Sequence, residues 1–232
     1  MTKLYEALKI PRGITSVVGG GGKTRLLDEL SLQLPGKVLR LTTTRIHPPQ
    51  CPCLINPRVS EMRQAFEEER VLCIARYAER DKLAMPEVPL EPLLEMADYV
   101  LVEADGSHGL PLKAPNEKEP YLLGGESLVI AMAGMSGLQR PIAEAAHRAE
   151  RYAALVHKTP LDTATPEDVA KVLESNDGLH KRVDSRFVVV LNQCDTPERT
   201  RLAQECAAAL QAPCILTRLE ADPSWWLDGR ED

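Results

Sequence analysis

The stretch from Gly19 to Thr24 reads GGGGKT and follows the apolar run ITSVV. Glycines let backbone N–H groups approach phosphate oxygens without a Cβ clash, and a helix N-terminus adds positive potential. Lys23 would reach the β- and γ-phosphates of a nucleotide, and Thr24 would place its hydroxyl on Mg²⁺. The usual phosphate-loop pattern has a glycine where this chain has Val17. We therefore predict a shortened phosphate loop, formed by Gly19, Gly20, Gly21, Gly22, Lys23 and Thr24.

The same six residues resemble the G-G-x-G-K-[ST] loop of the deviant Walker A ATPases. That group has a lysine just before the first glycine, where this chain has Val18. Catalysis in trans by that lysine is therefore not expected. The alternative is a glycine-rich turn that only begins a helix, but the strand before it and the helix after it favour a phosphate loop.

Two acids, Glu103 and Asp105, follow the apolar run YVLV at the end of another predicted strand. Either acid would hold Mg²⁺ opposite Thr24 or orient the attacking water, and the sequence does not distinguish them. Thr43 and Thr44 end the second strand, where we expect contact with the γ-phosphate. The alternatives are a solvated strand end for the acids and strand propensity for the threonines.

The run VVVLNQCD places Asn192 and Asp195 after a late, fully apolar strand. In the N-K-x-D element of GTPases, the aspartate accepts two hydrogen bonds from guanine, and adenine lacks that pair of donors. Gln193 stands here in place of the lysine. The element favours GTP over ATP. The alternative is an ordinary helix start with Asp195 as its cap.

Apolar strands alternate with helices along the chain, which predicts an α/β fold with a three-layer parallel sheet. In such sheets ligands bind at the carboxyl ends of the strands, where the polar motifs lie. We expect one P-loop NTPase-like domain over residues 1–232, with a small insert around 105–126 and a tail at 219–232. The strands are expected at 14–18, 37–44, 99–103, 127–134, 186–195 and 213–219, with a further short apolar run at 71–75. The helices are expected at 23–34, 58–70, from about 90, over most of 139–157, at 165–175 and at 196–210.

The composition argues against two classes of function, nucleic-acid binding and membrane binding. Of 232 residues 44% are hydrophobic, the net charge is −6, and no basic stripe is visible, which argues against nucleic-acid binding. No apolar run is long enough to span a bilayer, so we expect a cytoplasmic protein that does not bind membranes. The six cysteines are scattered, as in a reducing compartment. We expect buried core positions for Cys73, Cys194, Cys206 and Cys214.

A second group of polar residues leaves its role open. His47, Cys51 and Cys53 would suit a soft metal or a sulfur or selenium species, but a fourth ligand is lacking nearby, and incidental thiols in a rigid surface loop are the alternative. Arg148 would meet phosphate or lie on a helix surface with His147. His108 lies beside the two acids, where it would contact substrate or remain solvated.

Together these stretches resemble the selenium-dependent hydroxylase accessory family (YqeC type). The resemblance rests on VVGGGGKT, LTTTRI, VLVEADGSHGLPLKAPNEKEP, AGMSGL, HRAER and VVVLNQCD, in family order from about residue 14 to 195. It implies a P-loop NTPase-like fold and a role in maturing molybdenum hydroxylases that carry a labile selenium. It also implies that Lys113 is a basic residue of the PLKAP element. Arg45 and Gln193 depart from the family pattern.

The sequence thus favours Mg²⁺-dependent binding and slow hydrolysis of a purine nucleoside triphosphate, with GTP preferred. Lys23, Glu103 and Asp105 are the expected catalytic residues. Expected partners are the nucleotide and a molybdenum hydroxylase or its cofactor intermediate, and the oligomeric state stays open. A phosphoryl or nucleotidyl transferase acting on a small molecule such as a pterin is one alternative. A non-enzymatic scaffold that binds no nucleotide is the other.

Overall fold

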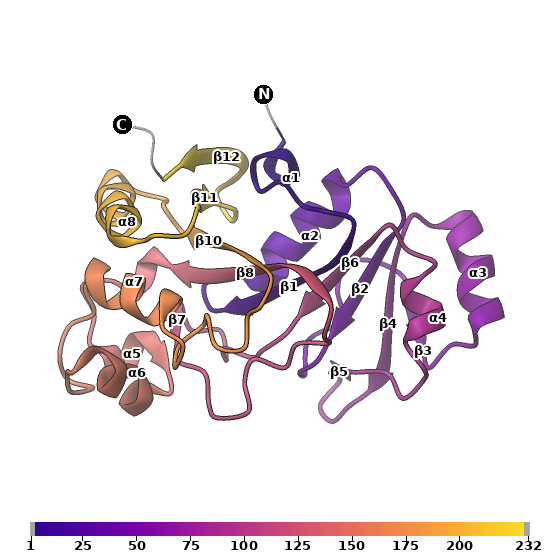
Figure 1. Ribbon diagram of the computed structural model, residues 1–232, viewed down its shortest axis with the longest axis horizontal. Helices are drawn as coiled ribbons and strands as arrows, with labels where there is room; N and C mark the ends of the chain where they lie inside the picture. The colour runs from indigo at the N-terminus through magenta and orange to yellow at the C-terminus, as the bar shows by residue number, and fades with distance from the viewer. Residues whose placement is uncertain (1–2, 230–232) are drawn as a thin grey trace.

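The computed structural model describes residues 3–229 of the chain. Its centre is a ten-stranded sheet in which all but two neighbouring pairs of strands are parallel (Figure 1). Strand β12 (Asp222–Asp228) is antiparallel to β11 (Cys214–Arg218), and β5 (Leu83–Ala84) is antiparallel to β4 (Val71–Tyr77). Apart from β5, the strands follow along the sheet in the order β12, β11, β10 (Arg186–Asn192), β8 (Glu126–Gly134), β1 (Gly13–Gly19), β6 (Tyr99–Glu103), β2 (Val38–Thr42), β4 and β3 (Cys53–Ile55).

Helices cover both faces of this sheet. One apolar cluster joins α1 and α2 to Val17, Leu101 and Ile130 on one face, and a larger cluster packs the later helices on the other. The predicted three-layer α/β fold with a mostly parallel sheet is therefore confirmed. The helical segments are α1 (Leu4–Ala7), α2 (Lys23–Gln33), α3 (Val59–Glu68), α4 (Glu91–Leu94), the 3-10 turn η1 (Met135–Gly137), α5 (Ile142–Ala145), α6 (Ala149–Val156), α7 (Pro166–Glu174) and α8 (Pro197–Ala209).

Strand β1 lies in the middle of the sheet, between β6 and β8, which both come later in the chain. The carboxyl ends of β1 and β6 are adjacent, since Val17 is in register with Glu103. Connections leave this point toward both edges of the sheet, which is where open α/β sheets bind ligands. The glycine loop at residues 19–22 and the two acids therefore meet at one place.

The predicted helix over most of 139–157 is wrong in its middle. Ala146 and His147 form strand β9, which pairs with β7 (Leu112–Lys113), and Arg148 has φ +62° before α6 begins. The helical pattern gives way because the side chain of Arg148 binds Glu119 of the 105–126 segment. A tertiary ion pair here outweighs local propensity.

The tail and the proposed insert contain short strands that the sequence pattern did not predict. The tail forms β12 as far as Asp228, and its last residues, 230–232, lie outside the described residues. The segment 105–126 contributes β7 and otherwise runs without helix or strand until β8 begins. The short strands β3 and β5 were also not predicted. Whether the chain is one domain remains a prediction.

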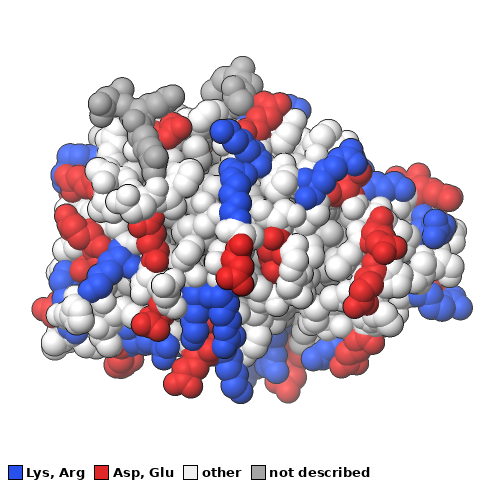
Figure 2. Space-filling view, viewed as in Figure 1, with Lys and Arg blue, Asp and Glu red and all other residues white. Residues whose placement is uncertain are grey.

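The surface seen in Figure 2 carries basic and acidic side chains interspersed, with no large field of one sign. None of the described helices is long and apolar enough to cross a membrane.

Candidate functional site

Helix α2 begins without a side-chain cap. Its N-cap is Gly22, with φ +114°, and no side chain accepts from its first amides. By contrast, the hydroxyls of Thr165 and Thr196 cap α7 and α8. An uncapped N-terminus leaves backbone N–H groups and the positive end of the helix dipole open to an anion.

The glycines before α2 are required by close packing as well as by backbone conformation. A Cβ on Gly19 would lie 2.2 Å from the carbonyl oxygen of Met132, and one on Gly21 would lie 2.3 Å from the amide nitrogen of Gly134. A Cβ on Gly20 would lie 2.6 Å from the carbonyl oxygen of Leu110. The loop is therefore wedged between the end of β8 and residues 110–111. Any larger residue would push the loop off its support.

The side chain of Lys23 folds back over the loop and is only 3% exposed. Its Nζ donates to the carbonyl oxygen of Gly19 at 2.6 Å and lies 3.2 Å from Oδ1 of Asp105. It is also 3.9 Å from Oε1 of Glu103. The ammonium group is thus held between the loop and both acids, at the end of β1 and β6.

Glu103 stands beside Thr24, whose hydroxyl donates to Oε2 of Glu103 at 3.0 Å. Glu103 is 7% exposed, whereas Thr24 is an exposed residue at the start of α2. Burial raises the pKa of Glu103, and Lys23 and the Thr24 hydroxyl oppose that rise. A hydroxyl and a carboxylate at this separation are the oxygen donors that Mg²⁺ prefers.

Asp105 is fully buried and serves the loop instead of facing solvent. Both of its carboxylate oxygens accept from the amide of Gly19, at 3.1 and 2.9 Å. Oδ2 also lies 2.9 Å from Nζ of Lys113, which is itself fully buried. Of the two predicted acids, Asp105 is therefore committed to holding the loop, and Glu103 is the one beside Thr24.

A chain of charges continues from Asp105 away from the loop. Nζ of Lys113 lies 3.0 Å from Oε2 of Glu119 and donates to the carbonyl oxygen of Gly106 at 2.6 Å. Arg148 donates to both oxygens of Glu119, at 2.7 and 3.1 Å. Burial alone would raise the pKa of Glu119, but Lys113 and Arg148 leave it below its usual value. Arg148 therefore binds a carboxylate in this structure.

The predicted threonines close the site on the β2 side. The hydroxyl of Thr42 donates to the carbonyl oxygen of Glu103 at 3.1 Å and accepts from the amide of Thr44 at 3.1 Å. Among the described residues, the Thr43 hydroxyl is a buried oxygen with no hydrogen-bond partner. A Cβ added to Gly106 would lie 3.4 Å from Oγ1 of Thr44, so the segments that follow β2 and β6 lie next to each other.

Asn192 joins the loop to the far half of the sheet. Its Nδ2 donates to the carbonyl oxygen of Gly21 at 2.7 Å, and its Oδ1 accepts from the Thr217 hydroxyl and the Leu219 amide, both at 3.0 Å. Gln193 has φ +65° and accepts from the hydroxyl of Ser136 at 2.5 Å. Asn192 is therefore largely used in positioning the loop.

Asp195 is the more available member of the pair. It forms an ion pair with Arg199 at 3.3 Å, one helical turn along, and its side chain is 28% exposed. The alternative prediction that Asp195 caps α8 is wrong, because Thr196 is the cap and accepts from the amide of Arg199.

His108 and His147 stack on each other, with ring centroids 4.4 Å apart, next to the charged chain. Burial lowers the pKa of His147 to about 4, and the positive charges of Arg148, His108 and Lys113 add to that effect. His147 is therefore neutral at neutral pH. No group of three or more histidine, cysteine or acidic side chains among residues 3–229 is arranged to hold a metal ion.

Sequence reasoning missed Glu119, which balances Lys113 and Arg148 from inside the 105–126 segment. The motif EKEP contained it, but an acid in a polar loop ordinarily reads as solvated. Its burial follows only from the pairing of β7 with β9, which brings the two segments together.

Most of this site lies in the part of the chain that known proteins share. The family model described as "YqeC protein" matches residues 15–150, which hold the loop, both acids, Lys113, Glu119 and Arg148. A curated relative, the uncharacterized protein YqeC of Escherichia coli (strain K12), is 32% identical over 199 residues, covering 78% of this chain and 77% of the relative. No solved structure shows significant similarity to the chain. The chain therefore belongs to the YqeC family.

Proposed function

We propose that this protein binds Mg²⁺ and a purine nucleoside triphosphate at the start of α2, and that it hydrolyses the nucleotide slowly. One observation carries the proposal. The Thr24 hydroxyl and the Glu103 carboxylate lie 3.0 Å apart, beside the ammonium of Lys23, at a helix N-terminus without a side-chain cap. Anion-binding amides, a lysine and two oxygen donors for Mg²⁺ are the parts that phosphoryl chemistry requires.

Each residue has a role that follows from its position. Lys23 would exchange the Gly19 carbonyl for phosphate oxygens and stabilise the charge that develops on them. Thr24 and Glu103 would hold Mg²⁺, which neutralises phosphate charge when it is bound. Asp105 would keep Gly19 and Lys23 in place. The buried hydroxyl of Thr43 has no partner among the described residues and would donate to the γ-phosphate.

The preference for GTP rests on Asp195. Its carboxylate is partly exposed and makes one ion pair, so it remains able to accept from the N1–H and 2-amino groups of guanine. Asn192 supports the same pocket indirectly by holding the loop at Gly21.

The biological role we propose is assistance in the maturation of a selenium-dependent molybdenum hydroxylase. This part is supported by the family resemblance alone. The nucleotide site would then serve a protein partner or a cofactor intermediate.

The direct test is calorimetric titration of the full chain, with Mg²⁺ present, against non-hydrolysable analogues of GTP and ATP. Binding of the GTP analogue supports the proposal. Turnover only in the presence of a small-molecule acceptor would favour a transferase instead. Absence of binding to either analogue would leave the scaffold alternative.

Replacing Thr24 by valine is expected to weaken Mg²⁺-dependent nucleotide affinity by about tenfold or more, since a metal ligand is lost while the shape is kept. Thr24→Ser is the matched control because it retains the hydroxyl, and it should bind nearly as the parent does. Titration with and without Mg²⁺ distinguishes the metal-dependent part of the nucleotide affinity from the metal-independent part. Equal losses for valine and serine would contradict a role for the hydroxyl.

Replacing Asp195 by alanine is expected to lower affinity for the GTP analogue by about tenfold, with little change for the ATP analogue. Glu198→Ala is the control, because Glu198 is an exposed acid on the first turn of the same helix. The guanine assignment would be wrong if the GTP and ATP analogues bind with equal affinity and Asp195→Ala changes neither affinity.

A further inference from the structure

A second cluster of reactive groups lies at the β3 edge of the sheet, away from the loop. Cys53 on β3 is in register with Cys73 on β4, and Cys73 is in register with Arg40 on β2. Residues directly paired in a parallel sheet project their side chains from the same face. The two thiols and the guanidinium therefore form one row across three adjacent strands.

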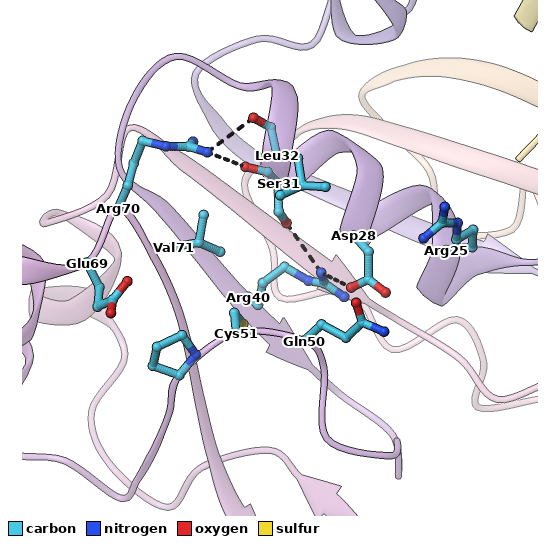
Figure 3. Close-up of a pocket in the computed structure, with 11 residues that line it drawn as sticks. Arg25, Asp28, Ser31, Leu32, Arg40, Gln50, Cys51, Glu69, Arg70 and Val71 are labelled. Carbon is cyan, nitrogen blue, oxygen red and sulfur yellow. Dashed lines mark hydrogen bonds and ion pairs between the residues drawn. The ribbon is translucent and has the colours of Figure 1, made fainter. Parts of the chain in front are cut away.

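Helix α2 covers only one end of this row. Arg40 is 3% exposed and donates to Oδ1 of Asp28 at 2.7 Å and to the hydroxyl of Ser31 at 3.3 Å, both on α2. Toward β3 none of the helices in residues 3–229 continues this cover, and a pocket of about 340 Å³ opens beside Arg40 and Cys51 (Figure 3). This volume lies at the small end of the range of ligand pockets.

Both cysteines of the pair have distinct surroundings. Cys53 is half-buried on the edge strand, whereas Cys73 is 1% exposed in a small apolar cluster with Ile46 and Leu83. The thiol of Cys53 donates to the carbonyl oxygen of Cys51 at 3.4 Å. Its interaction with the thiol of Cys73 lowers the pKa of Cys53 to about 7, and Arg40 lowers it further, while burial opposes the shift. The pKa of Cys73 is raised by the same contact and by its burial. A thiolate is therefore favoured on the accessible partner of the pair.

We propose that Cys53 and Cys73 form a redox-active dithiol that small soluble disulfides oxidise, with Cys53 as the attacking sulfur. Directly paired residues on neighbouring strands lie about 4.8 Å apart. This separation falls within the range of roughly 4.4–6.8 Å between the Cα atoms of disulfide-bonded cysteines. The Cα separation therefore permits the bond, which closes when the two side chains turn toward each other.

The reaction balances in two exchanges. The Cys53 thiolate attacks one sulfur of the small disulfide, forms a mixed disulfide and releases one thiolate. The Cys73 sulfur then attacks the Cys53 sulfur, forms the Cys53–Cys73 bond and releases the second thiolate, which takes up the Cys73 proton. The pair loses two electrons, and the small disulfide gains them. The small disulfide reaches Cys53 from solvent, because Cys53 is only half-buried on the edge strand.

The test treats the reduced full chain with glutathione disulfide, blocks the remaining thiols with iodoacetamide and maps the bonds by mass spectrometry. We expect a Cys53–Cys73 disulfide in the parent. Cys73→Ser should instead accumulate glutathione on Cys53, because serine keeps a donor but cannot resolve the mixed disulfide. Cys53→Ser should form neither product. Cys206→Ser, at another buried cysteine, should behave as the parent does.

The rate of thiol modification in the parent protein tests the proposal even if a variant is poorly folded. In the reduced parent, iodoacetamide should modify Cys53 about tenfold faster than Cys51, whose pKa burial raises to about 11. Cys73→Ala removes the Cys73 thiol and should slow modification of Cys53 by about tenfold. A first adduct on Cys51, a Cys51–Cys53 bond, or no reaction of the folded parent would each overturn the proposal.

Discussion

Replacing Lys113 by methionine is expected to lower the free energy of unfolding by about 3–5 kcal/mol, because it leaves buried carboxylates without their partner. Lys113 is fully buried, and its Nζ lies 2.9 Å from Asp105 and 3.0 Å from Glu119. Without it, Asp105 keeps only the Gly19 amide and Lys23. Urea denaturation followed by circular dichroism measures the change.

The matched control is Lys171→Met, since Lys171 is exposed on α7 and its replacement should leave the unfolding free energy essentially unchanged. A loss below about 1 kcal/mol in Lys113→Met would mean that water or rearrangement satisfies the two acids.

Helices and strands were predictable from the sequence where local preference and tertiary packing favour the same structure. The apolar strand before Gly19, the leucines of α2 and the Thr165-Pro166 start of α7 each satisfy local and tertiary demands at once. Adjacent carboxyl ends of parallel strands then bring the loop, Glu103 and Asp105 together, as the sequence led us to expect.

The division of work between the two acids was not predictable. Glu103 and Asp105 are two residues apart at the end of one strand, and both are acceptors that suit a metal. Their hydrogen bonds distinguish the two acids. The amide of Gly19 donates to Asp105, whereas the hydroxyl of Thr24 donates to Glu103. Such contacts depend on atomic positions across two strands, which residue types do not encode.

The charged chain beyond Asp105 depends on a long-range pairing of the same kind. Strands β7 and β9 are two residues long, too short to give a periodic pattern, yet their pairing ends one helix early and buries Glu119. The resemblance pointed to Lys113 as a basic residue of its motif. In the structure Lys113 binds Asp105, the acid that accepts from the Gly19 amide of the glycine loop.

Replacing Lys23 by alanine is expected to weaken binding of the GTP analogue by about a hundredfold, equivalent to about 2.7 kcal/mol, because a charged donor to phosphate is lost. The fold should survive with a lower unfolding free energy, since Asp105 still has the Gly19 amide and Lys113, whereas the buried Glu103 loses the ammonium group of Lys23. Calorimetric titration therefore reads phosphate binding directly, with thermal unfolding as the check on structure and Lys171→Ala as the surface control. An affinity within about threefold of the parent would contradict the assignment of this loop as the phosphate site. Loss of binding by a variant that is still folded at the temperature of the titration would support the start of α2 as the nucleotide site.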